Sequence, residues 1–293
     1  MTTIAPPPPA TAGPPPSLTP GGRSAWRALL VVAAAVLMVG TVIALGVLAW
    51  GISTFRVITD STTLPTAMRS LIVDTGSVPV AVRLTTDRET QEPRADLRMV
   101  NNMRAGANPL TLNAAGSEAR ITIDGEPSPF LQWSRAGEIT VVLPPDLARR
   151  LTVTIRQDTG VLFANADLDQ LIAHTEDGAV LLRGAARRIE VYNVHGEIAS
   201  QDPISVTESF SATTTSGDIR VDFAEPAPRT VNVSSEHGDV DVSLPPHGPY
   251  LVEAGAEWGD TEVRVPRTLD REAAAAVVTA RAGHGDVTID ERR

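Results

Sequence analysis

The chain has 293 residues, of which 42% are hydrophobic and 4% aromatic, and its formal net charge is −10. It contains no cysteine, which excludes disulfides, cysteine–metal sites and a cysteine nucleophile. Sequence-independent nucleic-acid binding needs a basic face that displaces counterions, so this acidic balance excludes it. We expect no nucleic-acid partner.

The first 27 residues are rich in proline and poor in large apolar side chains, with proline runs at residues 6–9 and 14–16. Such a segment cannot bury enough apolar surface to offset the entropy lost on ordering. We predict a disordered, cytoplasmic tail over residues 1–27. A solvated tail fits better than a docking ligand for a proline-binding partner, because no charge pattern flanks the prolines.

An uncharged apolar segment follows the tail. Residues 28–50 are long enough to cross a bilayer core as a helix. No cleavage site of the A-x-A type follows them, so we predict a transmembrane helix rather than a cleaved signal peptide. Arg23 and Arg27 precede the helix without any acidic residue, which favours a cytoplasmic N-terminus. A linker over residues 51–69 and an exported domain over residues 70–293 would then follow.

The exported part contains an internal repeat built around glycines. The steps between them are 18, 18, 21, 21, 21 and 26 residues, and the glycines are Gly160, Gly178, Gly196, Gly217, Gly238, Gly259 and Gly285. Apolar residues recur seven and five positions before each glycine and, in most copies, two positions after it. This alternation predicts a strand, a glycine turn and a second strand in each copy.

Two all-β architectures fit this repeat. Nearly constant steps of 18–21 residues favour a β-solenoid, in which each copy is a rung stacked about 4.8 Å from the next. Repeated β-hairpins in a sandwich or meander are the alternative, in which Val233 would pair with Val242. We interpret the 26-residue step as an insertion around residues 270–276, forming one helical turn on the outside.

The region before the clear repeats is less regular. Residues 71–76 and 137–141 look like further copies of the repeat. The polar stretch over residues 89–107 is typical of a long loop or of two irregular strands.

Three copies share a motif in which glycine, an acidic residue and an aliphatic residue follow one another. The motif appears in residues 215–221, 235–242 and 283–289. It resembles the rungs of the bacterial putative-adhesin domain of unknown function, and the resemblance covers roughly residues 70–290. The resemblance implies a β-solenoid-like domain in exported or membrane-tethered proteins, and it transfers no catalytic residue. Residues 158–161 and 177–179 depart from the motif, because no acidic residue follows their glycines.

An acidic residue follows five of the repeat glycines: Glu197, Asp218, Asp239, Asp260 and Asp286. In a solenoid these side chains would form a ladder, and hard divalent cations prefer carboxylate oxygens. Turn chemistry explains the same residues, because aspartate caps its own backbone and glycine supplies a positive φ. The glycine-rich calcium repeat is absent. We therefore predict turn residues, with no metal site and no cofactor.

Three histidines also precede repeat glycines: His195, His237 and His284. His195 and His237 would lie two rungs apart, with Ser216 between them, which is too far to share a zinc ion. Hydrolase and nucleotide-binding motifs are missing. A carbohydrate-active enzyme would need clustered carboxylates, and four charged residues fall close together in the repeat: Arg220, Glu236, Asp239 and Asp241. Solvation of an outward face explains them, so we predict no catalytic residue.

These patterns together predict a single-pass, membrane-anchored, extracytoplasmic β-repeat protein that is not an enzyme. It would serve as an envelope scaffold, adhesin-like binder or sensing partner, with an envelope protein or glycan as its partner. A carbohydrate-active β-helix enzyme and a membrane-tethered divalent-cation binder are the alternatives. The sequence leaves the oligomeric state open.

Overall fold

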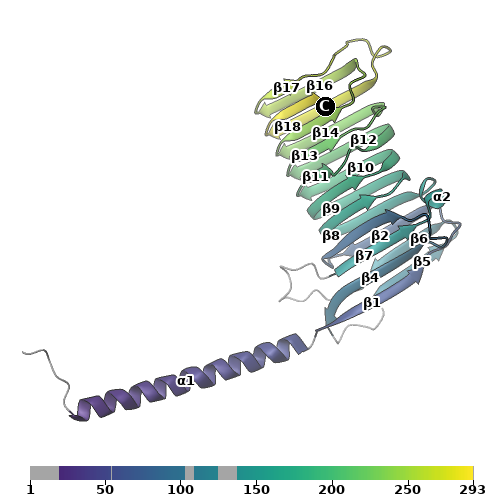
Figure 1. Ribbon diagram of the computed structural model, residues 1–293. Coiled ribbons are helices and arrows are strands. Elements are labelled where there is room, and N and C mark those ends of the chain that lie inside the picture. The colour runs from purple at the N-terminus through teal and green to yellow at the C-terminus, as the bar shows by residue number, and fades with distance from the viewer. Residues whose placement is uncertain (1–19, 54, 103–108, 125–136, 293) are drawn as a thin grey trace, which may run out of the picture. The chain divides into compact units, whose positions relative to one another are not determined.

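The computed structural model describes residues 20–53, 55–102, 109–124 and 137–292 (Figure 1). The chain divides into two units, residues 1–54 and Phe55–Arg293. Most of the predicted disordered tail lies outside the described residues. Residues 20–27 belong instead to the first helix, α1 (Pro20–Ser53).

Helix α1 extends beyond the predicted span at both ends. Over Leu29–Gly46 its mean hydropathy is 2.7, and none of this window is buried. Among the described residues it is the one helix long and apolar enough to cross a membrane. A helix that exposes apolar side chains all round is typical of a segment surrounded by lipid.

The β unit begins earlier than the sequence predicted. Strand β1 (Phe55–Thr63) lies within the expected linker and pairs antiparallel with β4 (Arg94–Asn102). Ser61 Oγ donates to Asp96 Oδ1 across this pair at 2.6 Å. β4 also replaces much of the irregular region expected over residues 89–107, and it pairs antiparallel with β7 (Gly137–Leu143).

The β unit is a β-solenoid. Each of its rungs contains two strand segments that are joined at a corner (Figure 1). The first segments of the rungs form one sheet, here called the first face. In spatial order it contains β5 (Leu110–Ala115), β6 (Glu118–Ile123), β2 (Ser70–Gly76), the first halves of β8 (Thr152–Asn165) and β9 (Leu168–Arg183), β10 (Ala185–His195), β12 (Ser205–Ser216), β14 (Thr230–His237), β18 (Ala276–His284) and β16 (Tyr250–Trp258).

The second segments form the opposite sheet, here called the second face. In spatial order it contains β1, β4, β7, β3 (Val80–Thr86), the second halves of β8 and β9, β11 (Ile198–Ser200), β13 (Ile219–Asp222), β15 (Val240–Leu244), β19 (Val287–Glu291) and β17 (Thr261–Val263). A single turn of helix, α2 (Pro145–Ala148), joins β7 to β8. The segments expected at residues 71–76 and 137–141 are indeed solenoid strands, β2 and β7.

Parallel pairing between copies decides between the two predicted architectures. Val233 pairs with Ala212 and Ala280 on neighbouring rungs, and Val242 pairs with Val221 and Ile289. In hairpins Val233 and Val242 would have paired with each other. The solenoid prediction is confirmed, and the hairpin alternative is wrong.

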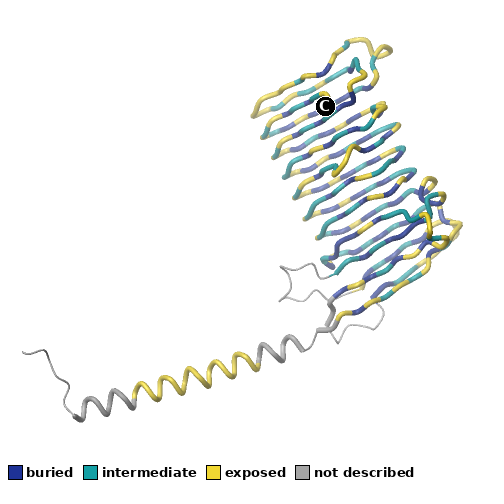
Figure 2. The backbone as a smooth tube through the Cα atoms, viewed as in Figure 1, coloured by how far each residue is buried: buried dark blue, intermediate teal, exposed yellow. Residues whose placement is uncertain are grey.

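The predicted apolar rows fill the interior, and buried and exposed positions alternate along the strands (Figure 2). Val231, Val233, Val240 and Val242 are at most 2% exposed. Their chain neighbour Asn232 is exposed on the outer side. Period-two alternation therefore sends every apolar row into the one core that adjacent rungs share.

At one end of the solenoid the spatial order of the rungs departs from the chain order. β18 and β19 lie between β14–β15 and β16–β17, so His284 pairs with both His237 and Trp258. The chain therefore builds the end rung first and then returns to insert its last rung beneath it. The expected outer helical turn is wrong: residues 271–273 form a plain turn within the returning segment, residues 264–275.

Candidate functional site

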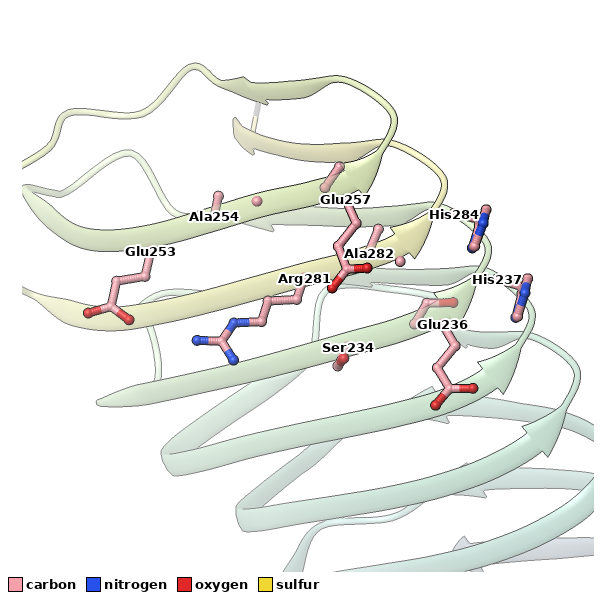
Figure 3. A pocket seen from close by; sticks show the side chains of 13 residues that line it. Ser234, Glu236, His237, Glu253, Ala254, Glu257, Arg281, Ala282 and His284 are labelled. Carbon is pink, nitrogen blue, oxygen red and sulfur yellow. The ribbon is translucent and has the colours of Figure 1, made fainter.

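A groove of about 690 Å³ lies on the first face, over β14, β18 and β16 (Figure 3). Gly255 and Gly283 occupy outward positions in it, where no side chain projects. Charged side chains of the three strands flank these glycines: Glu236 on β14, Arg281 on β18, and Glu253 and Glu257 on β16. The groove therefore results from strand alternation combined with glycine at two outward positions.

A column of stacked rings borders the groove at the glycine turns. The His237 and His284 rings lie with centroids 4.9 Å apart and planes 3° from parallel. The Trp258 indole stacks on His284 at 6.2 Å and 13°. Trp258 is on the last rung and is 70% exposed. Each ring immediately precedes a turn glycine, so in-register stacking of the rungs builds the column.

The predicted acidic ladder exists, but its hydrogen bonds run between rungs. The backbone N–H of Asp239 donates to Asp218 Oδ1 at 3.0 Å, and that of Asp286 donates to Asp239 Oδ1 at 2.9 Å. The N–H of Asp260 donates to Asp286 Oδ1 at 2.8 Å. The expectation that each aspartate caps its own turn is wrong, because the carboxylate binds the neighbouring copy.

Arg220 lies among three carboxylates, two of which belong to the ladder. Its guanidinium is 3.0 Å from Glu197 Oε1, 2.7 Å from Asp218 Oδ2 and 3.3 Å from Asp241 Oδ2. Burial raises the pKa of the Asp241 carboxyl, and Arg220 opposes that rise. Glu236 is on the first face and Asp241 on the second, so the structure does not assemble the four charged residues considered for an enzyme.

The histidines are only partly brought together. His195 and His237 both pair with Ser216, which places them two rungs apart as predicted. His195 Nδ1 instead lies 3.2 Å from Asp177 Oδ1. The described residues contain no group of three or more histidine, aspartate or glutamate side chains that could hold a metal ion.

A second column, of buried polar side chains, was missed from the sequence. Three positions before successive turn glycines stand Gln157, Thr175, Asn193, Thr214 and Ser235, each at most 4% exposed. Asn193 Nδ2 donates to the Gly178 carbonyl at 3.0 Å, and Ser235 Oγ donates to that of Gly217 at 2.9 Å. Asn193 and Ser235 therefore satisfy turn carbonyls inside the core, whereas Gln157 and Thr214 have buried polar atoms without a hydrogen-bond partner among the described residues.

These rungs match a known family model. The model is described as Toastrack DUF4097 and covers residues 148–290. Residues 148–290 are therefore similar to a Toastrack domain. The matched residues include the glycine turns from Gly160 to Gly285 and every residue of the groove. The resemblance to the putative-adhesin domain of unknown function is thereby confirmed.

Several solved structures match the chain at low sequence identity. A putative adhesin from Parabacteroides merdae is 10% identical over 81% of this chain and 97% of its own, with a TM-score of 0.45. One from Parabacteroides distasonis is 11% identical over 81% and 97%, with a TM-score of 0.41. A putative lipid binding protein from P. distasonis is 12% identical over 80% and 97%, with a TM-score of 0.42. No curated protein matches the sequence.

Proposed function

We propose that the chain is a membrane-anchored, extracytoplasmic binding scaffold without catalytic activity. The observation that carries this proposal is the groove with its ring column. It combines the largely exposed indole of Trp258, the two outward glycines Gly255 and Gly283, and four charged side chains. All of them lie on strands that pair in register. An exposed aromatic ring on a rigid platform is typical of recognition surfaces, because it gives contact area at low entropic cost.

The anchor is helix α1, with the N-terminal tail, residues 1–27, in the cytoplasm. Support comes from the fully exposed apolar window of α1 and from Arg23 and Arg27 ahead of it. β1 follows α1 almost directly in the chain. The groove belongs to the opposite end of the β unit, where it would face partners such as an envelope protein or a glycan.

A binding role fits the groove better than catalysis. On the second face, Arg220 pairs with the carboxylates of Glu197, Asp218 and Asp241 and offsets part of their negative charge. The side chains of the groove come from three rungs but include no nucleophile hydrogen-bonded to a base among the contacts of the described residues. We infer that the groove holds a ligand without transforming it.

The absence of cysteine allows a direct test of the anchor and its orientation. Single substitutions Ser17→Cys, in the tail, and Leu269→Cys, at a fully exposed loop residue, would be made in the full chain. Intact cells with an opened outer barrier would be treated with a membrane-impermeant maleimide. We expect labelling of the Leu269→Cys chain only, with Ser17→Cys reacting after lysis. Labelling of Ser17→Cys in intact cells, or release of the β unit from membranes, would contradict the proposal.

A further inference from the structure

We propose that the end rung of the solenoid, β16 with β17, binds an extended cationic segment of a partner protein, which pairs with β16 as an additional strand. This inference names the class of partner for the proposed function and rests on it. It is argued from the backbone of the end rung, its apolar row, its charge and the strand that already pairs with it.

The backbone of β16 is open on one side. The N–H of Tyr250 donates to Pro266 and its carbonyl accepts from Thr268, so residues 266–268 cover only the start of the strand. Backbone groups of alternate residues point to the same side of a strand. Those of Val252 and Ala254 therefore point the same way as Tyr250, away from β18, and have no partner among the described residues.

The end of the apolar core is also uncovered there. Val252, Ala254 and Ala256 are only partly buried, whereas the residues paired with them on β18 are at most 2% exposed: Val278, Ala280 and Ala282. The sequence of this rung differs from the other rungs at Thr261. Thr261 stands where other rungs carry a buried aliphatic residue, and its Oγ1 accepts the N–H of Ala256 at 3.1 Å. A further strand would bury the three partly exposed side chains.

The negative charge of the end rung favours a cationic binding partner. Residues 250–263 contain four acidic residues and no basic one. Glu262 pairs with Arg264, but Glu253, Glu257 and Asp260 form no ion pair with any described residue. A second copy of the chain would bring these carboxylates against each other, which is unfavourable. A cationic strand would neutralise them.

The covered side of β16 shows which kind of strand fits. β18 has the sequence AVVTARAGH, with small apolar residues inward and Arg281 outward. Arg281 lies in the groove between Glu236 on one side and Glu253 and Glu257 on the other (Figure 3). Edge strands recognise extended peptides through main-chain hydrogen bonds, with alternate side chains giving specificity. The open side of β16 offers a bound strand the same kinds of contact that β18 makes on the covered side: main-chain hydrogen bonds, an apolar row and neighbouring carboxylates.

The test uses the full chain in detergent micelles and a labelled nonapeptide, AVVRATARH. This peptide keeps the β18 pattern and places arginine opposite Glu253 and Glu257. The two comparison peptides are AVVEATAEH, with reversed charge, and AVVRAPARH, in which proline at position 6 removes the backbone N–H that would donate to the Ala254 carbonyl. Binding would be followed by fluorescence anisotropy. We expect AVVRATARH to bind and the other two to bind about tenfold or more weakly.

Charge reversal in the protein makes the result specific to β16. Glu253→Arg with Glu257→Arg should weaken binding of AVVRATARH about tenfold and restore binding of AVVEATAEH. The matched control is Asp158→Arg with Glu176→Arg, on the same face and with the same change of charge, but on rungs covered on both sides. This control should bind like the unaltered chain.

Several results would overturn the inference. They are no binding of AVVRATARH, equal binding of the proline peptide, an equal loss in the control variant, and a dimer that the Glu253→Arg, Glu257→Arg variant dissociates. The last result would show that a second copy occupies the edge. Cysteine labelling tests the anchor and its orientation without any peptide, so failure of this inference and failure of the proposed function are distinguishable.

Discussion

His237 and His284 stack ring on ring, with centroids 4.9 Å apart, although the whole of the β16–β17 rung separates them in the chain. Their contact follows from the insertion of the last rung between two earlier ones. The same insertion leaves β16 as the edge strand of the first face and Trp258 as the last ring of the column. Both the groove and the proposed strand-binding edge depend on this rung order.

The turn glycines are required by contact between rungs as well as by backbone conformation. Gly238 has φ of +146°, and a β-carbon there would overlap the carbonyl of Gly217 on the rung below. We expect Gly238→Ala to lower the free energy of unfolding by about 2–4 kcal/mol. Urea unfolding of the full chain in micelles, followed by circular dichroism, measures this.

Two control variants accompany that prediction. Gly255→Ala has open space around the new methyl group, and Asp239→Asn keeps an oxygen for the N–H of Asp286. Each should change the free energy of unfolding by about 0.5 kcal/mol or less. A Gly238→Ala effect as small as theirs would show that the turn tolerates a side chain.

Burying a charge inside one rung should disturb the two rungs that touch it. Val233 is 2% exposed, and its paired residues are Ala212 on β12 and Ala280 on β18. Val233→Asp would bury an unpaired carboxylate at a cost of about 3 kcal/mol or more. Hydrogen exchange should therefore accelerate in β12 and β18 as well as in β14.

The control for that experiment is Asn232→Asp, which places the same acid on the exposed side of the same strand. It should leave exchange rates nearly unchanged. Faster exchange confined to residues 230–244 would mean that the rungs are independent units and would contradict a shared core.

Arg187 links three rungs by ion pairs, and this predicts a pH dependence. Its guanidinium binds Asp169 on β9 at 2.8 Å and Glu208 on β12 at 2.9 Å. The hydrogen bond from Arg187 lowers the pKa of Asp169 below its ordinary 3.8, and those from Arg188 and Arg187 lower the pKa of Glu208. Such pairs stabilise the fold above the ordinary carboxyl pKa, and the stabilisation is lost as pH falls through the lowered values.

Arg187→Gln should therefore lower the melting temperature at pH 7 and have a smaller effect near pH 2, because the Asp169 and Glu208 carboxyls take up protons as the pH falls. Arg149→Gln, which removes only a local pair with Asp146 on α2, should have a smaller effect at pH 7. An Arg187→Gln effect of equal size at both pH values would show that the side chain acts by packing and not by charge.

The rungs could be predicted from the sequence because each repeats one apolar pattern about the same glycine. The similarity of the copies is also why the rung order could not be predicted. The apolar row of β16, with Val252, and that of β18, with Val278, could pack equally well against the row of β14, with Val231. The returning segment, residues 264–275, allows the order that was adopted. The buried Asn193 and Ser235 were missed because they are polar at inward positions. Trp258 could have been found by extending the histidine register to the position before Gly259.

The most direct test of the rung order, and with it of β16 as an edge strand, is a pair of engineered disulfides in this cysteine-free chain. His237→Cys with His284→Cys places two thiols on directly paired residues of adjacent rungs. His237→Cys with Trp258→Cys places them two rungs apart, about 9.6 Å, beyond the Cα separation that a disulfide spans. After mild oxidation and mass spectrometry of the peptides, we predict a disulfide in the first variant and free thiols in the second. A disulfide in the second variant only would show that the rungs follow chain order, with β16 between β14 and β18, and would contradict this account.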